Sequence, residues 1–239
     1  MAGRDPAPPQ AEGGPPVPLQ HYFSERPQVG HRRRTLRFLY RGRVLTCLTD
    51  RGVFASEGLD PGTALLIENM LVPERAEVLD VGSGWGPIGL AAAVAAPRGR
   101  VVLVDPNRRA VSLSRENLAA NGVSNAEVFR GSFFAPVEGR RFDLVVSNPP
   151  YHLGRASLEH FFSEVPVHLK PHGRLLLVGK GSQGALYYQR RLGEIFVRVE
   201  ILARGGGYRV LEASEPRSRP DPSRGPDSPG SRPPDVAKS

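Results

Sequence analysis

The chain has 239 residues, enough for one well-cored α/β domain and little more. With 32 Lys and Arg against 24 Asp and Glu, its formal net charge is +8, which favours a polyanionic partner such as nucleic acid. The single cysteine, Cys47, excludes an intramolecular disulfide, and the absence of a signal-like or long apolar run predicts a cytoplasmic protein without a membrane segment.

Both ends of the chain differ in composition from the middle. Residues 1–20 and 213–239 are rich in Pro, Ser, Gly and Arg and contain few apolar side chains, so we expect two disordered tails. The folded domain is expected over residues 21–212, and it carries nearly all of the positive charge.

The first elements of this domain form a predicted β-hairpin over residues 35–49. Thr35–Tyr40 and Arg43–Thr49 are rich in β-branched and aromatic residues, and Arg41-Gly42 separates them. The arginines in and before the hairpin either contact RNA, with Arg33 and Arg34 as the candidates, or form a solvated face.

A turn at residues 60–62 and a short helix follow the hairpin, and strands and helices then alternate. The predicted strands are Val78–Val81, Val101–Val104, Ala126–Phe129, Leu144–Ser147 and Leu175–Val178. The predicted helices are Ile88–Ala96, Arg109–Asn121, Leu158–Leu169 and Ala185–Ile195. Apolar strands alternating with helices predict a doubly wound parallel sheet. Two strands joined by Gly205–Gly207 end it, so we expect a mostly parallel seven-stranded sheet whose last strand is antiparallel.

A glycine-rich turn follows the first parallel strand in the stretch "VLDVGSGWGPIGLA". Gly82, Gly84 and Gly86 open a helix, where missing Cβ atoms and free N–H groups let a ligand approach the backbone. Asp105, at the end of the second strand, can accept both hydroxyls of a ribose.

Two ligands remain possible for this turn. Gly84, Gly86 and Gly89 match the dinucleotide pattern G-x-G-x-x-G. The second ligand is S-adenosylmethionine, with Asp80 and the Gly82–Gly86 turn around its methionine end. Asp80 favours this cationic ligand, since a carboxylate at that position would repel a pyrophosphate.

The fourth strand ends in Asn148-Pro149-Pro150-Tyr151, which is either a rigid turn or a site for methyl transfer to an amine. An exocyclic amine of a base is a poor nucleophile, and two acceptors on its N–H bonds would fix its direction. The Asn148 side-chain oxygen and the Pro149 carbonyl can be those acceptors, and the prolines stiffen the loop. Tyr151 offers a face on which an extruded base can stack.

The chain at this point resembles the class I S-adenosylmethionine-dependent methyltransferases of the methyltransferase small domain group. It is most similar to the bacterial 16S rRNA (guanine-N2)-methyltransferases and their single-domain relatives. The residues that carry the resemblance are "HYFSERP" (His21–Pro27), "TDRGVFASEGLDPGTALLIE" (Thr49–Glu68), the glycine-rich turn, "VDPNRRAV" and "SNPPYHLG". Long members of the group have a further amino-terminal domain, and they tend to have Phe where Tyr151 stands.

The resemblance implies a Rossmann-like methyltransferase fold and assigns residues to its ligands. The residues implied around the cofactor are Asp80, Gly82, Ser83, Gly84, Gly86, Asp105 on the ribose, Ser132 near the adenine, and Asn148. Asn148 to Tyr151 would hold the target base, and Phe54 and Asp60 would border the pocket.

The predicted function is therefore methyl transfer to a guanine amine of small-subunit ribosomal RNA. Adenine-N6 and protein glutamine-N5 methylation stay open, because their acceptors are also planar nitrogens. The same motifs leave room for a nicotinamide-dependent oxidoreductase and for a catalytically idle RNA-binding or assembly factor. No metal is expected, since His152 and His160 lack further ligands at metal spacing. Neither the target nucleotide nor the oligomeric state follows from the sequence.

Overall fold

The computed structural model describes residues 29–149 and 154–217. The expected tail over residues 1–20, the "HYFSERP" segment, Pro150, Tyr151, His152 and residues 218–239 lie outside the described residues. Within the described part of the chain, no helix combines the length and the apolar character needed to cross a membrane.

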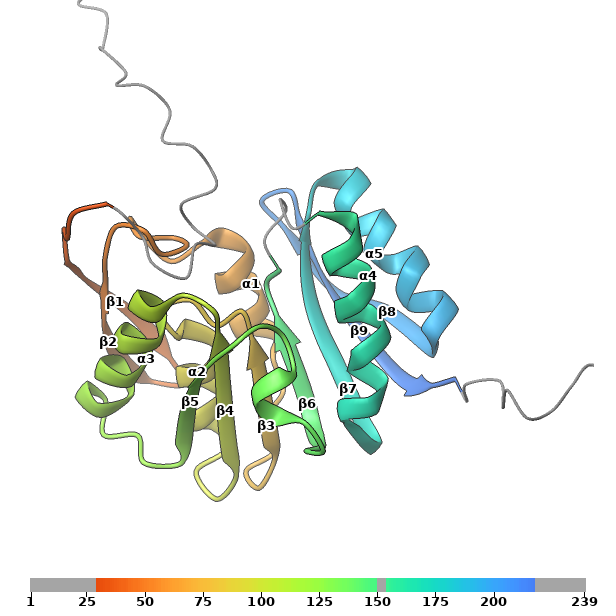
Figure 1. Ribbon diagram of the computed structural model, residues 1–239, viewed down its shortest axis with the longest axis horizontal. Coiled ribbons are helices and arrows are strands. Elements are labelled where there is room, and N and C mark those ends of the chain that lie inside the picture. Colours follow the sequence, from red (N-terminus) through yellow and green to blue (C-terminus); the bar gives the residue numbers. More distant parts are fainter. Residues whose placement is uncertain (1–28, 150–153, 218–239) are drawn as a thin grey trace, which may run out of the picture.

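A seven-stranded sheet forms the centre of the molecule, in the order β5-β4-β3-β6-β7-β9-β8 (Figure 1). Its strands are β3 (Glu77–Val81), β4 (Arg100–Asp105), β5 (Ala126–Arg130), β6 (Phe142–Ser147), β7 (Leu169–Lys180), β8 (Phe196–Gly205) and β9 (Tyr208–Pro216). β3 to β7 pair in parallel, whereas β9 lies between β7 and β8 and is antiparallel to both. The predicted fold class is confirmed.

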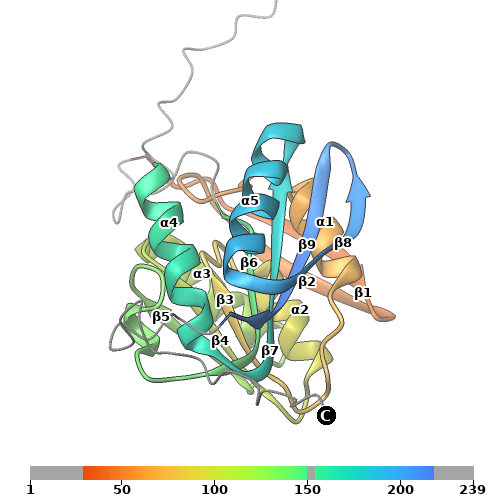
Figure 2. The ribbon, with the colours of Figure 1, turned by 90° about the vertical axis from the view of Figure 1, so that its right-hand side faces the viewer.

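Helices cover both faces of the sheet, because each inner strand is apolar on both sides. The helices are α1 (Pro61–Asn69), α2 (Pro87–Ala95), α3 (Arg108–Ala120), α4 (Arg155–Glu164) and α5 (Gly181–Ile195), with 3₁₀ turns at Ala135–Val137 and Val165–His168. Val78 belongs to the core under α1, α2 and α3, whereas its neighbour Leu79 belongs to the core under α4 and α5. Figure 2 shows α4 and α5 side by side on one face.

The predicted hairpin is also confirmed, as β1 (Arg34–Tyr40) paired with β2 (Arg43–Thr49) in a separate two-stranded sheet. Two asparagines, one within α3 and one directly after it, fasten the hairpin to the domain. Asn117 accepts from the N–H of Leu48 at 2.6 Å and donates to its C=O at 2.9 Å. Asn121 does the same for Thr46, at 3.1 Å and 2.7 Å. The side-chain amides thus bond to the edge of β2 as a third strand would.

We expect Asn117→Ala to lower the free energy of unfolding by about 2–3 kcal/mol. The reason is that Asn117 is buried and also donates to the Trp85 carbonyl at 2.8 Å, so its loss leaves several backbone groups without partners. Urea unfolding measures the change. The half-exposed Asn69, which makes a single bond to the Leu65 carbonyl, supplies the control Asn69→Ala, with an expected loss under about 1 kcal/mol. Equal losses in the two variants would contradict the role of Asn117.

Several boundaries differ from the sequence expectation; α5, for example, begins at Gly181 rather than Ala185. β9 continues to Pro216 rather than stopping at residue 212, because Ala213 is fully buried and pairs with Leu175 of β7. The helix expected over Leu158–Leu169 ends at Glu164, followed by a 3₁₀ turn containing Pro166, and β7 already begins at Leu169. Val165 still donates to the Phe161 carbonyl, but Pro166 has no backbone N–H to continue the α-helical hydrogen bonds, which accounts for this early end.

Candidate active site

The expected site residues gather where β3, β4 and β6 end. These strands are parallel neighbours, so their carboxyl ends lie at one edge of the sheet, which is where ligands bind in open α/β folds. A cavity of about 330 Å³ opens there, a suitable size for a small ligand. Of the expected site residues, those that line it are Phe54, Gly82, Gly84, Asp105, Ser132, Asn148 and Pro149.

The glycine-rich turn has the backbone conformation that requires glycine. Gly82, Gly84 and Gly86 all have positive φ, at 74°, 58° and 88°. At Gly82 and Gly84 a Cβ atom would meet nothing within 4 Å, so these two residues leave open space beside the cavity. At Gly86 a Cβ atom would approach the Ser114 Oγ to 2.9 Å, so this glycine lets the turn pack against α3. Gly86 does not line the cavity.

A second, smaller cavity of about 20 Å³ adjoins the turn, and Phe54, Asp60 and Ser83 are among its lining residues. Several buried polar atoms at and behind it have no hydrogen-bond partner among the described residues. They are Ser83 Oγ, Trp85 Nε1, Asn148 Oδ1 and, on β3 directly before the turn, Asp80 Oδ1. Buried polar groups are nearly always paired, so four orphaned atoms in one place indicate a missing polar ligand.

The two strand-end carboxylates are buried and partly satisfied by backbone N–H groups. Asp80 accepts from Gly89 at 2.8 Å, and Asp105 accepts from Gly84 and from Asn107, both at 2.8 Å. Burial raises the pKa of Asp80 to about 7, and the Asp105 charge adds to this effect while the Gly89 bond opposes it. Burial likewise raises the pKa of Asp105 to about 6 against its two hydrogen bonds. A cation at Asp80 and hydroxyls at Asp105 would favour the ionised forms.

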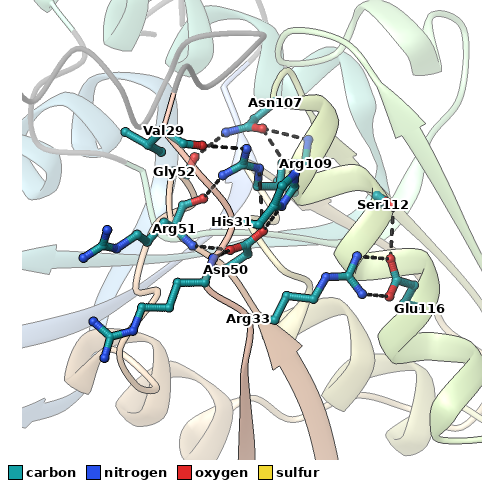
Figure 3. A network of polar contacts seen from close by, with 12 residues as sticks. Val29, His31, Arg33, Asp50, Arg51, Gly52, Asn107, Arg109, Ser112 and Glu116 are labelled. Atoms are coloured by element: carbon teal, nitrogen blue, oxygen red, sulfur yellow. Dashed lines mark hydrogen bonds and ion pairs between the residues drawn. The ribbon is translucent and has the colours of Figure 1, made fainter.

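Asn107 connects Asp105 to the segments that flank the hairpin, and Figure 3 shows it between Gly52 and Arg109. Its backbone N–H donates to Asp105, and its side-chain amide donates to the Gly52 carbonyl at 2.7 Å. Beside it, Arg109 donates to the carbonyls of Val29 and Arg51. The chain on both sides of the hairpin is thereby held against the start of α3, next to the cavity.

Arg33 and Arg34, the arginines expected to contact RNA, lie on the surface in ion pairs. The Arg33 guanidinium makes two bonds to the Glu116 carboxylate, at 2.8 Å and 3.2 Å (Figure 3). Arg34 lies 3.9 Å from the Glu57 carboxylate. Neither lines a cavity. By contrast Arg32, Arg37 and Arg41 are exposed, and the described residues offer their guanidinium groups no carboxylate partner.

The Asn148 side chain lies on the same edge as the glycine-rich turn. Its Nδ2 donates to Asp60 Oδ2 at 2.9 Å and to Thr63 Oγ1 at 2.8 Å. A carboxylate only accepts, so the amide face toward Asp60 must be the NH₂ group. Both N–H bonds are used, and Oδ1 is left as a buried acceptor without a partner among the described residues.

Sequence reasoning missed several residues of the site. Ser157 and Phe161 of α4 line the larger cavity, and Trp85 brings an unpaired indole N–H to the smaller one. The sequence did contain local signals for Thr63 and Asn107, because both lie in patterns typical of a helix start. Thr63 belongs to "DPGT" at the start of α1, and Asn107 belongs to "DPNRR" at the start of α3. Within the described chain, no cluster of three or more His, Cys, Asp or Glu side chains could hold a metal ion.

Comparisons with known proteins agree with this geometry. The methyltransferase small domain model matches residues 44–212. A Bacillus subtilis protein named "Uncharacterized protein YbxB" is 34% identical over 198 residues, covering 82% of this chain and 98% of its own length. The ribosomal RNA small subunit methyltransferase C of Escherichia coli K12 is 39% identical over 173 residues, covering 71% of this chain.

Among solved structures, a Thermus thermophilus 16S rRNA N2 methyltransferase in complex with AdoMet and guanosine superposes with a TM-score of 0.68. It is 30% identical, and the match covers 77% of this chain and 50% of that one. The chain spans about half the length of this protein and of the methyltransferase C relatives.

The residues present fit S-adenosylmethionine, abbreviated AdoMet. Its ammonium requires an acceptor and its carboxylate requires donors, and the orphaned Asp80 Oδ1, Ser83 Oγ and Trp85 Nε1 supply both kinds of group. Asp105 remains available for the ribose in the larger cavity. The dinucleotide interpretation is wrong, because the methyltransferase family model covers most of the domain and the similar Thermus thermophilus structure holds AdoMet. The chain belongs to the methyltransferase small domain family of AdoMet-dependent methyltransferases.

Proposed function

We propose that this protein methylates the exocyclic N2 amine of a guanine in 16S ribosomal RNA. The observation that carries the proposal is the unpaired Oδ1 of Asn148, a buried acceptor at the edge of the AdoMet pocket. The names of the Thermus thermophilus and Escherichia coli relatives support guanine N2 and ribosomal RNA as the target.

The proposed chemistry requires orientation more than acid–base catalysis. AdoMet supplies a sulfonium methyl group; the N2–methyl bond forms as the methyl–sulfur bond breaks, and one N2 proton is released to solvent. Asn148 Oδ1 accepts one N–H of the target amine, and the Pro149 carbonyl accepts the other. Acceptors fixed in advance in a buried site stabilise the positive charge that develops on the amine. The base-stacking role expected for Tyr151 concerns a residue outside the described part of the chain and stays a prediction.

The hairpin arginines are the proposed contacts to RNA phosphates. Because Arg33 and Arg34 are engaged by acidic side chains, the exposed Arg32, Arg37 and Arg41 carry more of this proposal than the two residues favoured by the sequence. Phosphate contacts of this kind determine affinity and salt dependence rather than the choice of base.

Mass spectrometry of nucleosides tests the function directly. The purified full chain is incubated with AdoMet and either unmodified 16S rRNA or assembled small subunits, and the RNA is digested to nucleosides. We expect N2-methylguanosine from at least one of the two substrates. Methyladenosine alone, or methylglutamine formed on an added release factor, would assign adenine or glutamine as the acceptor instead. RNA binding without any methylation would favour the idle RNA-binding factor.

A further inference from the structure

Asp60 bonds to three groups that lie far apart in the sequence. Its Oδ2 accepts from the backbone N–H of Thr63 at 2.9 Å, which caps the start of α1, and from Asn148 Nδ2 at 2.9 Å. Its Oδ1 accepts from the Tyr208 hydroxyl at 3.1 Å, at the start of β9. The cap alone would need only the first of these bonds.

The bond to Asn148 has an electronic consequence as well as a geometric one. When the NH₂ group of an amide donates to an anion, its electrons shift toward the carbonyl oxygen, which then becomes a stronger acceptor. That oxygen is Oδ1, the atom without a partner among the described residues. Asp60 lines only the smaller cavity, so its charge reaches the larger one through Asn148, which lines both.

The Asp60 carboxylate is itself held from both sides. Burial raises the pKa of Tyr208, and the Asp60 charge and hydrogen bond raise it further, so the hydroxyl stays protonated and donates. The Tyr208 ring packs against Gly62, where an added Cβ would lie 2.4 Å from the ring. With Thr63 on the other oxygen, the carboxylate cannot turn away from Asn148 without breaking bonds to α1 or β9.

We propose that Asp60 is a positioning residue for methyl transfer, which orients the Asn148 amide and increases the acceptor strength of its Oδ1. The inference rests on the proposed role of Asn148 as the acceptor for a target N–H. It assigns Asp60 to Asn148 instead of to the substrate, for which the sequence had made it a candidate. Thr63 assists from the second N–H of the same amide.

Asp60→Asn separates this role from helix capping. Asparagine caps helices about as well as aspartate and has the same shape, but it carries no charge. We expect kcat to fall about tenfold, as for the loss of one charge-assisted bond, with KM for RNA within about threefold of wild type. Asp143→Asn is the matched control. Asp143 lies near the start of β6, at the opposite end from Asn148, and it also accepts a backbone N–H, from Glu77 at 2.8 Å. The kcat of this variant should equal that of the wild type.

A double-mutant cycle tests the route through Asn148. If Asp60 acts through that amide, Asp60→Asn adds no further loss to Asn148→Ala. Additive losses, or a wild-type kcat for Asp60→Asn, would overturn the proposal. The cycle uses whichever amine the mass spectrometry identifies, so an error about guanine leaves this test intact.

A spectroscopic readout does not depend on turnover. In protein labelled with ¹⁵N-asparagine, the side-chain NH₂ signal of Asn148 is identified by its disappearance in Asn148→Ala. We expect one of its protons to resonate downfield in the wild type, through the bond to a carboxylate, and to move upfield in Asp60→Asn but not in Asp143→Asn. An unchanged signal in Asp60→Asn would overturn the proposal even if activity fell.

Discussion

Asn148→Ala is expected to lower kcat by about 10²–10³-fold while AdoMet binds with nearly unchanged affinity. The substitution removes Oδ1, the unpaired acceptor that follows β6 and lies at the edge of both cavities. It also removes the donor that Asn148 provides to Asp60 and Thr63. These two residues still bond to each other, because the Thr63 N–H donates to the Asp60 carboxylate at the start of α1. Single-turnover rates with 16S rRNA give the chemical step, and calorimetry gives the AdoMet dissociation constant.

The control for this variant is Asn69→Ala, which removes the same kind of side chain from the last turn of α1. Its kcat should equal that of the wild type. If Asn148→Ala kept more than about a tenth of the wild-type rate, the amide would not be the main acceptor. If it lost AdoMet binding instead, Asn148 would belong to the cofactor site rather than to the reacting amine.

AdoMet affinity is expected to rise about 20-fold between pH 5.5 and pH 7.5. The free protein holds Asp80 with a pKa of about 7, raised mainly by burial, whereas the ligand's ammonium favours the ionised carboxylate. Below that pKa, binding must first remove a proton, so affinity falls by up to about tenfold per pH unit; above it, the dependence disappears. Calorimetry in buffers of different ionisation enthalpy should also show proton release near pH 6.

Asp80→Asn should remove most of this pH dependence and weaken binding by about 10²-fold at pH 7.5, because a neutral amide replaces the carboxylate proposed to attract the ammonium. Asp105 also titrates, with a pKa raised to about 6, so a smaller dependence below pH 6.5 would remain in this variant. A wild-type affinity that did not change with pH would mean that Asp80 does not meet the ammonium.

Much of the fold followed from the sequence because its signals are local. Apolar strands, helix caps and glycine turns each lie within a few residues, and they located the hairpin, the parallel strands and the strand ends at Asp105 and Asn148. The contacts that define the site were less accessible. Tyr208 reaches Asp60 across 148 positions, and no local pattern marks such a pair. The ion pair of Arg33 with Glu116 was missed for the same reason, since it joins the hairpin to α3.

The pairing of β2 with α3 determines which side of the hairpin is open to another chain. Asn117 and Asn121 occupy the outward N–H and C=O groups of Leu48 and Thr46, so no strand can add at that edge. In the described chain β1 pairs only with β2, so its other edge is open. The outward N–H and C=O groups of that edge belong to Thr35, Arg37 and Leu39, which lie opposite Leu48, Thr46 and Val44. Arg37 lies in the middle of that edge and is exposed. Edge-to-edge association of two copies would bring these arginines together, so their repulsion protects the hairpin from self-association.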